Sequence, residues 1–179
     1  MTVNSVIRQK NIKKRQNISK ICHTKHSHKI ISNLKKYLKK TKNIASYYAV
    51  KGEIETATLH SYLFKLKKNL YLPKIKDDKL EFFKYKPSSV MKNNKYKIPE
   101  PYRETSYLLK KIDIMFVPLV AFDTKCHRLG FGGGFYDKTL GQLQKKDRPI
   151  LIGLAHSFQL NKNIKTHKFD IDLDFVFYG

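Results

Sequence analysis

The chain has no tryptophan and only two cysteines, and no apolar run in it is long enough to cross a bilayer. Its longest apolar stretches, 112–117 and 150–155, have the length of strands, whereas a membrane span needs about 20 apolar residues. Residues 1–20 are basic but contain no continuous apolar segment and no small-residue cleavage site, so no secretory signal is predicted. We therefore expect a cytoplasmic protein without a membrane partner.

Cysteine is too scarce for a disulfide framework or a closed metal site. Cys22 and Cys126 form no CxxC pair, and we expect both thiols to be reduced. Cys22 lies close to His23, His26 and His28, but one short segment rarely supplies every ligand of a tetrahedral site. The preferred interpretation of this segment is the solvated start of a helix.

Acidic residues are also few: 14 Asp and Glu stand against 37 Lys and Arg, which gives a formal net charge of +23. Such a charge attracts polyanions at low salt, so a nucleic-acid-binding protein is one alternative. The lysines are scattered through every segment, however, and the same charge steers small anions such as ATP or the carboxylate tail of a folate. Charge alone identifies no partner, and nucleic acid is the less favoured one.

The hydrophobic pattern alternates between strands and helices. With 179 residues, of which 41% are hydrophobic, the chain fits one domain, residues 1–179. Helical spacing occurs over about 27–40, from Leu59 to Leu70, and at Tyr136, Leu140 and Leu143; strands are predicted at 43–50, 70–73, 79–85, 113–117, 150–155 and 175–178, with a loop-rich segment at 86–110.

Apolar strands without polar alternation, separated by amphipathic helices, indicate a sheet that is covered on both faces. We therefore predict a single three-layer α/β/α domain, Rossmann-like, with a largely parallel or mixed sheet. Ligands of such sheets bind at the carboxyl ends of the strands, which is where the loop 118–137 would lie.

Four of the eight glycines fall within residues 130–134. Glycine lets several backbone N–H groups converge on one anion, and the positive end of the helix that follows adds to the attraction. Arg128, before this segment, can bind phosphate oxygens, and Asp137, after it, can hold the magnesium of a nucleotide. A merely flexible surface loop is the alternative, but it would have no need of the arginine and the carboxylate.

Two better-known phosphate motifs do not match. The segment lacks the Gly-Lys-Ser/Thr ending of a P-loop, and Phe135 stands where a dinucleotide fingerprint starting at Gly130 requires glycine. A related α/β protein that binds a nucleotide or sugar phosphate without further chemistry is therefore a second alternative.

The run 112–140 resembles the signature of the 5-formyltetrahydrofolate cyclo-ligases, also called methenyltetrahydrofolate synthetases. That signature combines a proline, Ala-Phe-Asp, Arg-Leu-Gly and a glycine-rich turn ending in Tyr-Asp, here found from Pro118 to Asp137. Weaker matches follow the family's order: Gly52-Glu53-Ile54-Glu55-Thr56, Leu72-Pro73, Ile98-Pro99-Glu100-Pro101, Ala155-His156-Ser157-Phe158-Gln159 and His167-Lys168-Phe169-Asp170.

The resemblance implies a monomeric enzyme that uses ATP and Mg²⁺ to cyclise 5-formyltetrahydrofolate to 5,10-methenyltetrahydrofolate, releasing ADP and phosphate. It implies Arg128 and Tyr136 as catalytic residues, Glu53 and Tyr136 at the substrate, and Asp137 and Asp170 at the metal. The residues implied at ATP are Arg8, Arg128, Gly130, Gly132, Gly133, Gly134, Phe135, Tyr136 and Asp137.

Some of these assignments have alternatives. Glu53 can accept paired hydrogen bonds from the amino and N–H groups of a pterin ring, or it can simply cap the following helix. Tyr85, like Tyr136, can stack on folate rings or belong to the core. Cys126 stands where the family has a turn glycine and is interpreted as a tolerated loop substitution rather than a catalytic thiol.

The amino-terminal segment departs from the family, which carries a Lys-x-x-x-Arg pair at ATP. Aligning Arg8 with that arginine leaves Asn4 at the position of the lysine. Either Lys10 and Lys14 form the pair in another register, or one phosphate contact is missing and ATP binds more weakly.

Overall fold

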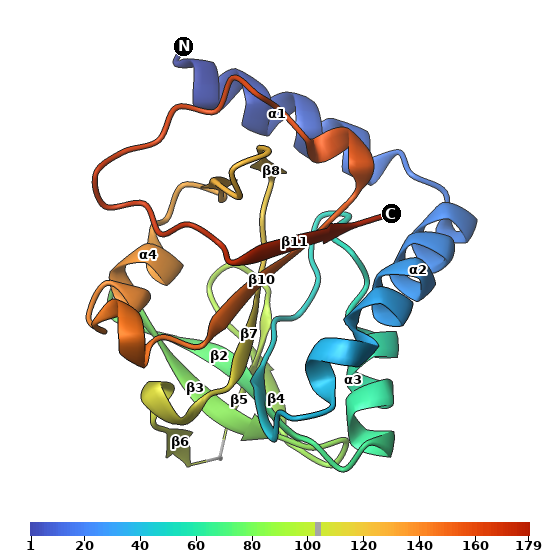
Figure 1. The fold of residues 1–179 in the computed structure, drawn as a ribbon, viewed down its shortest axis with the longest axis vertical. Coiled ribbons are helices and arrows are strands. Elements are labelled where there is room, and N and C mark those ends of the chain that lie inside the picture. The colour runs from blue at the N-terminus through green and yellow to red at the C-terminus, as the bar shows by residue number, and fades with distance from the viewer. Residues whose placement is uncertain (103–104) are drawn as a thin grey trace.

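The computed structural model describes residues 1–102 and 105–179 (Figure 1). At its centre lies a seven-stranded sheet with the order β11-β10-β7-β1-β2-β3-β6. These strands are β1 (Asn43–Ala45), β2 (Asn69–Lys76), β3 (Lys79–Tyr85), β6 (Ser106–Tyr107), β7 (Ile114–Val117), β10 (Ile150–Ala155) and β11 (Phe175–Tyr178).

The five strands from β11 to β2 are parallel, and β3 and β6 extend the sheet in antiparallel fashion. After β1 the chain builds β2 on one side and later returns to place β7 on the other side. The strand order thus reverses between β1 and β7, and in open sheets of this kind a ligand crevice forms at the carboxyl ends of such a pair.

Helices cover both faces of the sheet, which confirms the predicted α/β sandwich (Figure 1). Helices α2 (Lys20–Leu38) and α3 (Ala57–Lys65) pack on one face, and the short helix α4 (Phe135–Leu140) packs on the other. Strand β7 shows why its sequence is apolar throughout: Ile114 and Phe116 belong to the core under α2 and α3, whereas Met115 and Val117 belong to the opposite core.

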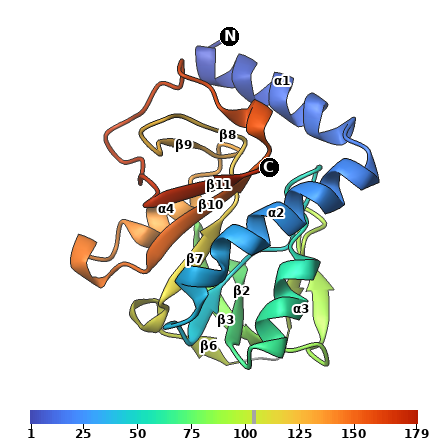
Figure 2. The same cartoon turned by 45° about the vertical axis from the view of Figure 1, so that its right-hand side comes forward.

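Helix α1 (Val3–Gln16) does not join either layer but crosses the carboxyl-terminal end of the parallel strands (Figures 1 and 2). Its buried residues are Asn4, Ile7, Asn11 and Arg15, at helical spacing. Three of these four are polar, so hydrophobic periodicity gave no signal and no helix was predicted here.

Several predicted boundaries differ from the structure. Helix α2 begins at Lys20 rather than near 27, with Ser19 accepting a capping hydrogen bond from the backbone of Cys22 at 3.3 Å. The strand predicted at 43–50 ends at Ala45, and β2 extends to Lys76. Leu143 lies beyond helix α4, which ends before Gly141.

The loop-rich segment 86–110 and the segment after β7 contain short strands that the sequence pattern did not predict. These are β6, given above, with β4 (Met91–Asn93), β5 (Pro99–Pro101), β8 (Ala121–Phe122) and β9 (Arg128–Leu129). Single 3₁₀ turns occur at Leu109–Lys111, Lys145–Asp147 and Ser157–Gln159. Strands of two or three residues are too short to show periodicity.

Two expected absences can be compared with the described residues, 1–102 and 105–179. No helix in this part of the chain has the length and apolarity of a membrane span. Likewise, no group of three or more His, Cys, Asp or Glu side chains there is arranged to hold a metal ion, the segment with Cys22 included.

Candidate active site

The loops after β1, β7 and β10 lie at the end of the sheet that α1 crosses (Figure 2). Side chains of α1 hydrogen-bond the backbone of the loops after β7 and β10. The Nδ2 group of Asn11 donates to the carbonyl of Val120 at 3.0 Å, and Nη1 of Arg15 donates to the carbonyl of Leu119, also at 3.0 Å. The polar inner face of α1 therefore pairs backbone carbonyls of the loop after β7 that strand neighbours leave open.

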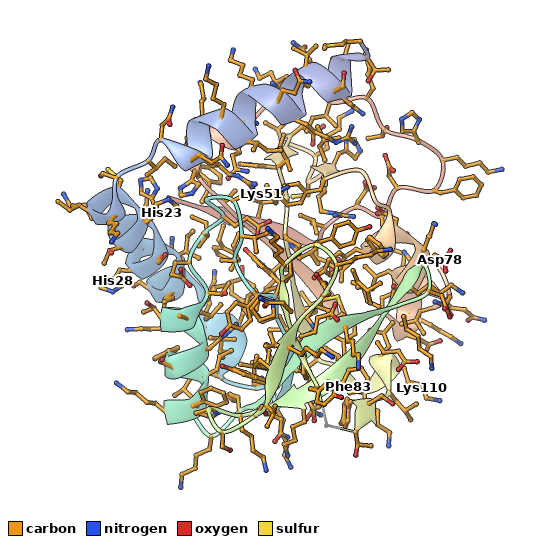
Figure 3. All side chains as sticks on the ribbon, turned by 180° about the vertical axis from the view of Figure 1, so that it is seen from behind. His23, His28, Lys51, Asp78, Phe83 and Lys110 are labelled. Carbon is orange, nitrogen blue, oxygen red and sulfur yellow. The ribbon has the colours of Figure 1, made fainter. Side chains whose placement is uncertain are left out.

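The loop after β1 ends in a tight turn, residues 50–53, here called the Glu53 turn. Lys51 and Gly52 both have positive φ, 49° and 74°, and the N–H of Glu53 donates to the carbonyl of Val50 at 3.1 Å. A Cβ on Gly52 would lie 2.6 Å from the carbonyl oxygen of Arg15, so only glycine fits. Figure 3 shows Lys51 at the tip of this loop.

The carboxylate of Glu53 is buried and points back over its own turn. Its Oε2 accepts a hydrogen bond from the N–H of Val50 at 2.9 Å, and its Oε1 has no hydrogen-bond partner among the described residues. The N-cap residue of helix α3 is Thr56, and the N–H of Ala57, the first residue of the helix, donates to Oε1 of Glu55 at 2.9 Å. The capping alternative for Glu53 is therefore wrong.

Arg15 lies beside Glu53 in the interior. Its Nη1 is 3.9 Å from Oε1 of Glu53, and both side chains are almost fully buried, at 0% and 2% exposed. Burial raises the pKa of Glu53 to about 7, although the N–H of Val50 and the charge of Arg15 act in the opposite direction. This buried carboxyl group is thus poised between its two protonation states near neutral pH.

Residues 130–134, here called the glycine turn, lie against the guanidinium of Arg8. The Nε of Arg8 donates to the carbonyl of Gly130 at 2.8 Å, and a Cβ on Gly132 would meet the guanidinium carbon at 3.7 Å. Gly132 and Gly134 have positive φ, 105° and 66°. The structure thus places Arg8, which the alignment assigns to ATP, against the glycine turn.

Arg128 and Asp137 form a close ion pair on the far side of the glycine turn. Nη2 of Arg128 donates to Oδ1 of Asp137 at 2.7 Å, and the same oxygen accepts from the N–H of Ile171 at 3.1 Å. The side chain of Arg128 is only 5% exposed, and its Nε has no partner among the described residues. Helix α4, which starts here, has only six residues, so its dipole adds less attraction for an anion than that of a longer helix would.

The segment that contains Asp170 contacts this ion pair through the backbone of the next residue, Ile171. Asp170 precedes Ile171, whose N–H binds Asp137, and its own Oδ2 accepts from the N–H of His167 at 2.8 Å. The two carboxylates that the resemblance assigned to a metal therefore come from segments in contact, with Oδ1 of Asp137 already engaged by Arg128.

Two tyrosines line the space between the glycine turn and Glu53. The ring of Tyr136 lies 5.8 Å from the guanidinium carbon of Arg128, and the charge of Glu53 acts on its hydroxyl. Tyr47 is buried, its hydroxyl has no partner among the described residues, and the charges of Glu53 and Arg15 both act on it. Burial raises the pKa of both phenols, so both stay neutral.

Tyr85 lines a cavity of about 180 Å³ together with Tyr48 and Glu55, which come before and after the Glu53 turn. Its ring centroid is 6.0 Å from His60 and 5.9 Å from Phe64. Cavities that hold whole ligands usually measure about 300–1,000 Å³, so this one accommodates only part of a large substrate.

The remaining predicted residues have mainly structural contacts. Asn4 is buried and exchanges two hydrogen bonds with the backbone of Lys165, at 2.7 and 3.1 Å. Lys10 is exposed, and the ammonium of Lys14 lies 5.7 Å from the ring centroid of Phe158, whereas Arg8 contacts the glycine turn.

Phe135 and Cys126 are both partly buried and pack against the core on the α4 side of the sheet. A Cβ on Gly133 would lie 2.8 Å from the ring of Phe135, so this ring leaves no room for a side chain at position 133 unless it moves. Cys126 has a positive φ of 65°, which fits a position where glycine is more usual, and burial raises the pKa of its thiol.

His26 and His156 form a pair that contacts the backbone of the Glu53 turn. Nδ1 of His26 and Nδ1 of His156 are 2.8 Å apart, and Nε2 of His156 is 3.1 Å from the carbonyl of Gly52. Because a carbonyl only accepts, His156 donates from Nε2 and, when neutral, accepts from His26. Figure 3 shows His23 of the same helix facing this region, whereas His28 points away from it.

Sequence reasoning did not predict Arg15 or Tyr47 as site residues. Arg15 is one of several basic residues near the end of α1, and Tyr47 lies in an apolar run, so neither stands out by composition. A usable signal was the helical spacing of Asn4, Ile7, Asn11 and Arg15, which puts Arg15 on the inner face of α1.

Comparisons with known proteins confirm the family that the sequence resembles. Residues 1–179 match the 5-formyltetrahydrofolate cyclo-ligase family. A 5-formyltetrahydrofolate cyclo-ligase of Haemophilus influenzae is 41% identical over 146 residues, covering 79% of this chain and 78% of the relative. One of Escherichia coli is 37% identical over 139 residues, covering 74% and 75%.

Solved structures give the same result. A 5,10-methenyltetrahydrofolate synthetase of Aquifex aeolicus superposes with a TM-score of 0.86 at 32% identity, covering 99% of this chain and 90% of the other. The 5,10-methenyltetrahydrofolate synthetase of Mycoplasma pneumoniae gives 0.79 at 26% identity, with 98% of both chains covered.

Proposed function

Because the chain belongs to the 5-formyltetrahydrofolate cyclo-ligase family, we propose that it uses ATP and Mg²⁺ to close 5-formyltetrahydrofolate into 5,10-methenyltetrahydrofolate. The observation that carries the proposal is the meeting of two different polar surfaces at one end of the sheet. One is the glycine turn with Arg8 and Arg128, and the other is the buried Glu53.

The glycine turn fits the phosphates of ATP. Within residues 1–102 and 105–179, nothing accepts a hydrogen bond from the N–H groups of 131–134, so these donors are free to bind an anion. Arg128 adds a buried Nε without a partner, and Arg8 adds positive charge from the opposite side.

The carboxylates beside the turn fit a magnesium ion. Mg²⁺ usually keeps several waters and takes one or two protein carboxylates together with substrate phosphates, and Asp137 and Asp170 supply that number. When bound, the ion would neutralise charge on the phosphates. Arg128 would hold Asp137 in the orientation seen here.

The region around Glu53 suits the pterin ring of the substrate. The ring's amino group and its neighbouring N–H are two donors side by side, which a carboxylate binds as a pair. Glu53 is buried with one oxygen unpartnered, and Tyr136 lies between it and Arg128. This arrangement would direct the formyl group of the substrate toward the glycine turn. The part of the folate beyond the pterin ring would extend toward the cavity that Tyr85 lines.

In the proposed reaction the formyl oxygen on N5 attacks the γ-phosphorus, and the bond from that phosphorus to ADP breaks. The N10 nitrogen then loses its proton and attacks the formyl carbon, and the C–O bond to phosphate breaks. The protein aligns the reactants and stabilises charge, through Arg128 and the N–H groups of the glycine turn, so no protein nucleophile is required.

An absorbance assay for the methenyl product tests the proposal. Purified protein should form the product only when 5-formyltetrahydrofolate, ATP and Mg²⁺ are all present, and EDTA should stop the reaction. Lack of product under these conditions would reject it; steeply salt-dependent binding of nucleic acid would then favour the alternative suggested by the charge of +23. The monomeric state and cytoplasmic location expected from the sequence are part of the proposal.

A further inference from the structure

Arg15 is fully buried, yet two of its donor groups have no partner. Its Nη1 donates to the carbonyl of Leu119 at 3.0 Å, but its Nε and Nη2 bind nothing in the described part of the chain. Its distance of 3.9 Å from Glu53 is too long for a hydrogen bond. A buried charged donor without a partner is costly, so these groups point to a ligand that supplies the missing acceptor.

The unpartnered polar atoms of the interior concentrate at this position. Six buried side-chain atoms lack a hydrogen-bond partner among the described residues, and four of them belong to Arg15, Tyr47 and Glu53. Two are donors of Arg15, one is the hydroxyl of Tyr47, and one is Oε1 of Glu53. Donors and an acceptor therefore lie side by side, next to where the pterin ring is proposed to bind.

We infer that Arg15 donates a hydrogen bond to the 4-oxo group of the substrate's pterin ring and makes the site select 4-oxo over 4-amino pteridines. This inference rests on the proposed function. Along one edge the ring presents its 2-amino group, its N3–H and then the oxygen at C4. A carboxylate matches the first two groups and a guanidinium matches the third, and Glu53 and Arg15 lie side by side with atoms of both kinds unpartnered.

A 4-amino group at the same place presents donors, and it would face the donors of a buried cation. A site built to hydrogen-bond one group rejects an analogue that lacks it, because the site's own polar atoms are then left unpaired. Arg15 would therefore exclude 2,4-diaminopteridines by charge and by hydrogen-bond polarity, whereas Glu53 alone accepts the amino groups of either ring.

Phe131 of the glycine turn packs against this position. Its ring centroid lies 5.2 Å from the guanidinium carbon of Arg15 and 5.5 Å from the ammonium of Lys51, while the residue is 40% exposed. A ligand that reaches Arg15 would therefore also contact the ring of Phe131, which glycines 130 and 132 flank.

The test is equilibrium binding, without ATP, of 5-formyltetrahydrofolate and of its 4-amino analogue, which differs only at C4. The unmodified protein should prefer the 4-oxo compound by about 10- to 100-fold, as expected for a hydrogen bond to a charged group. In Arg15→Met the two compounds should bind with dissociation constants within about threefold of each other, mainly because the 4-oxo compound binds more weakly.

Arg15→Gln is the second variant, because its amide can present either a donor or an acceptor and still reach toward Leu119. It should also bind the two compounds within about threefold of each other. Arg148→Met is the matched control: Arg148 likewise donates to backbone carbonyls, those of Leu140 and Leu143 at 3.2 and 3.3 Å, but has no contact with Glu53. Its preference should equal that of the unmodified protein.

A purely structural role of Arg15 would lower the affinity for both compounds by the same factor and leave their ratio unchanged, and that result would overturn the inference. So would an unmodified protein that does not prefer the 4-oxo compound. Should Arg15→Met not fold, as judged by its thermal transition, the ratio in Arg15→Gln decides. Failure of the proposed function is a different result, namely no methenyl product from the unmodified protein.

Discussion

The two sides of the candidate site are built in opposite ways. On the phosphate side, residues 131–133 of the glycine turn are exposed, and Arg128 is paired with Asp137 at 2.7 Å, with only its Nε left unpartnered. On the ring side, Glu53 and Arg15 are buried and leave polar atoms without partners. One side presents free backbone donors to solvent, and the other holds charged side chains in a dry interior.

This difference indicates how each side recognises its ligand. Backbone N–H groups bind any phosphate of suitable shape, and water already solvates them before the ligand arrives. Buried and unpartnered groups lower the stability of the free protein, but they discriminate strongly because a mismatched ligand leaves them unsatisfied. The phosphate side is therefore expected to control turnover, and the ring side is expected to control substrate choice and pH dependence.

Replacement of Asp137 should give the largest effect and tests the phosphate side. Asp137→Ala removes a proposed metal ligand and the partner of Arg128, so kcat should fall by about 10²- to 10³-fold while the protein still folds. Asp137→Asn keeps the acceptor for the N–H of Ile171 but not the charge, and should lose turnover to a similar extent.

Asp78→Ala is the control for this experiment, because Asp78 is an exposed aspartate that pairs with Lys138 of the same helix α4, at 3.1 Å. It should keep normal turnover. If Asp137→Asn retained full ATP-dependent cyclisation with an unchanged dependence on Mg²⁺ concentration, the metal assignment would be wrong.

Replacement of Glu53 tests the ring side. Glu53→Gln should raise KM for 5-formyltetrahydrofolate by about 10- to 100-fold with little change in KM for ATP, since it removes a charged acceptor for the pterin ring. Steady-state kinetics with each substrate varied in turn measure both constants. Equal changes in the two would contradict the division of the site into two sides.

The pH dependence of Glu53 gives a sharper form of the same test. With a pKa of about 7, the ionised form that binds the ring increases as the pH rises through 7, so kcat/KM for the folate should rise over that range and flatten in Glu53→Gln. Absence of that inflection in the unmodified protein would show that Glu53 is ionised throughout or does not bind the ring.

Stability should change in the opposite direction. Because burial raises the folded-state pKa above its ordinary value of 4.5, the native state holds the extra proton between pH 4.5 and 7, and stability falls as the pH rises through that window. The loss amounts to about 3 kcal/mol at most. Glu53→Gln should therefore be more stable than the unmodified protein at pH 8 and nearly equal to it at pH 4.5, as urea unfolding would measure.

The smallest expected effect is a loss of stability when glycine is replaced, at Gly52 on the ring side or at Gly134 on the phosphate side. Gly52 and Gly134 have similar φ, 74° and 66°, but a Cβ would lie 2.6 Å from a backbone oxygen at Gly52 and 3.8 Å from a lysine side chain at Gly134. Gly134→Ala should cost about 1 kcal/mol of unfolding free energy, from the left-handed backbone alone. Gly52→Ala should cost at least ~2 kcal/mol, because the close contact adds to that strain. Equal losses would show that the Glu53 turn is less tightly packed than this structure indicates.

Secondary structure followed from the sequence where an apolar run is distinct. Strands β3, β10 and β11 were predicted with their bounds, although only β10 is buried along most of its length. Helix α1 was missed because its buried face is polar: Asn11 and Arg15 pack against backbone carbonyls rather than against hydrocarbon. Hydrophobic periodicity cannot detect such a helix.

The sequence by itself determined the α/β class, the family and the composition of the glycine turn, because strand burial and glycine spacing are local properties of the chain. Only the tertiary structure decided that Arg15, 38 positions before Glu53 in the chain, lies beside it with donors unpartnered, and that Asn4 holds the backbone of Lys165. Contacts between such distant positions depend on how α1 crosses the strand ends, and a buried polar atom shows its lack of a partner only when every neighbour is in place.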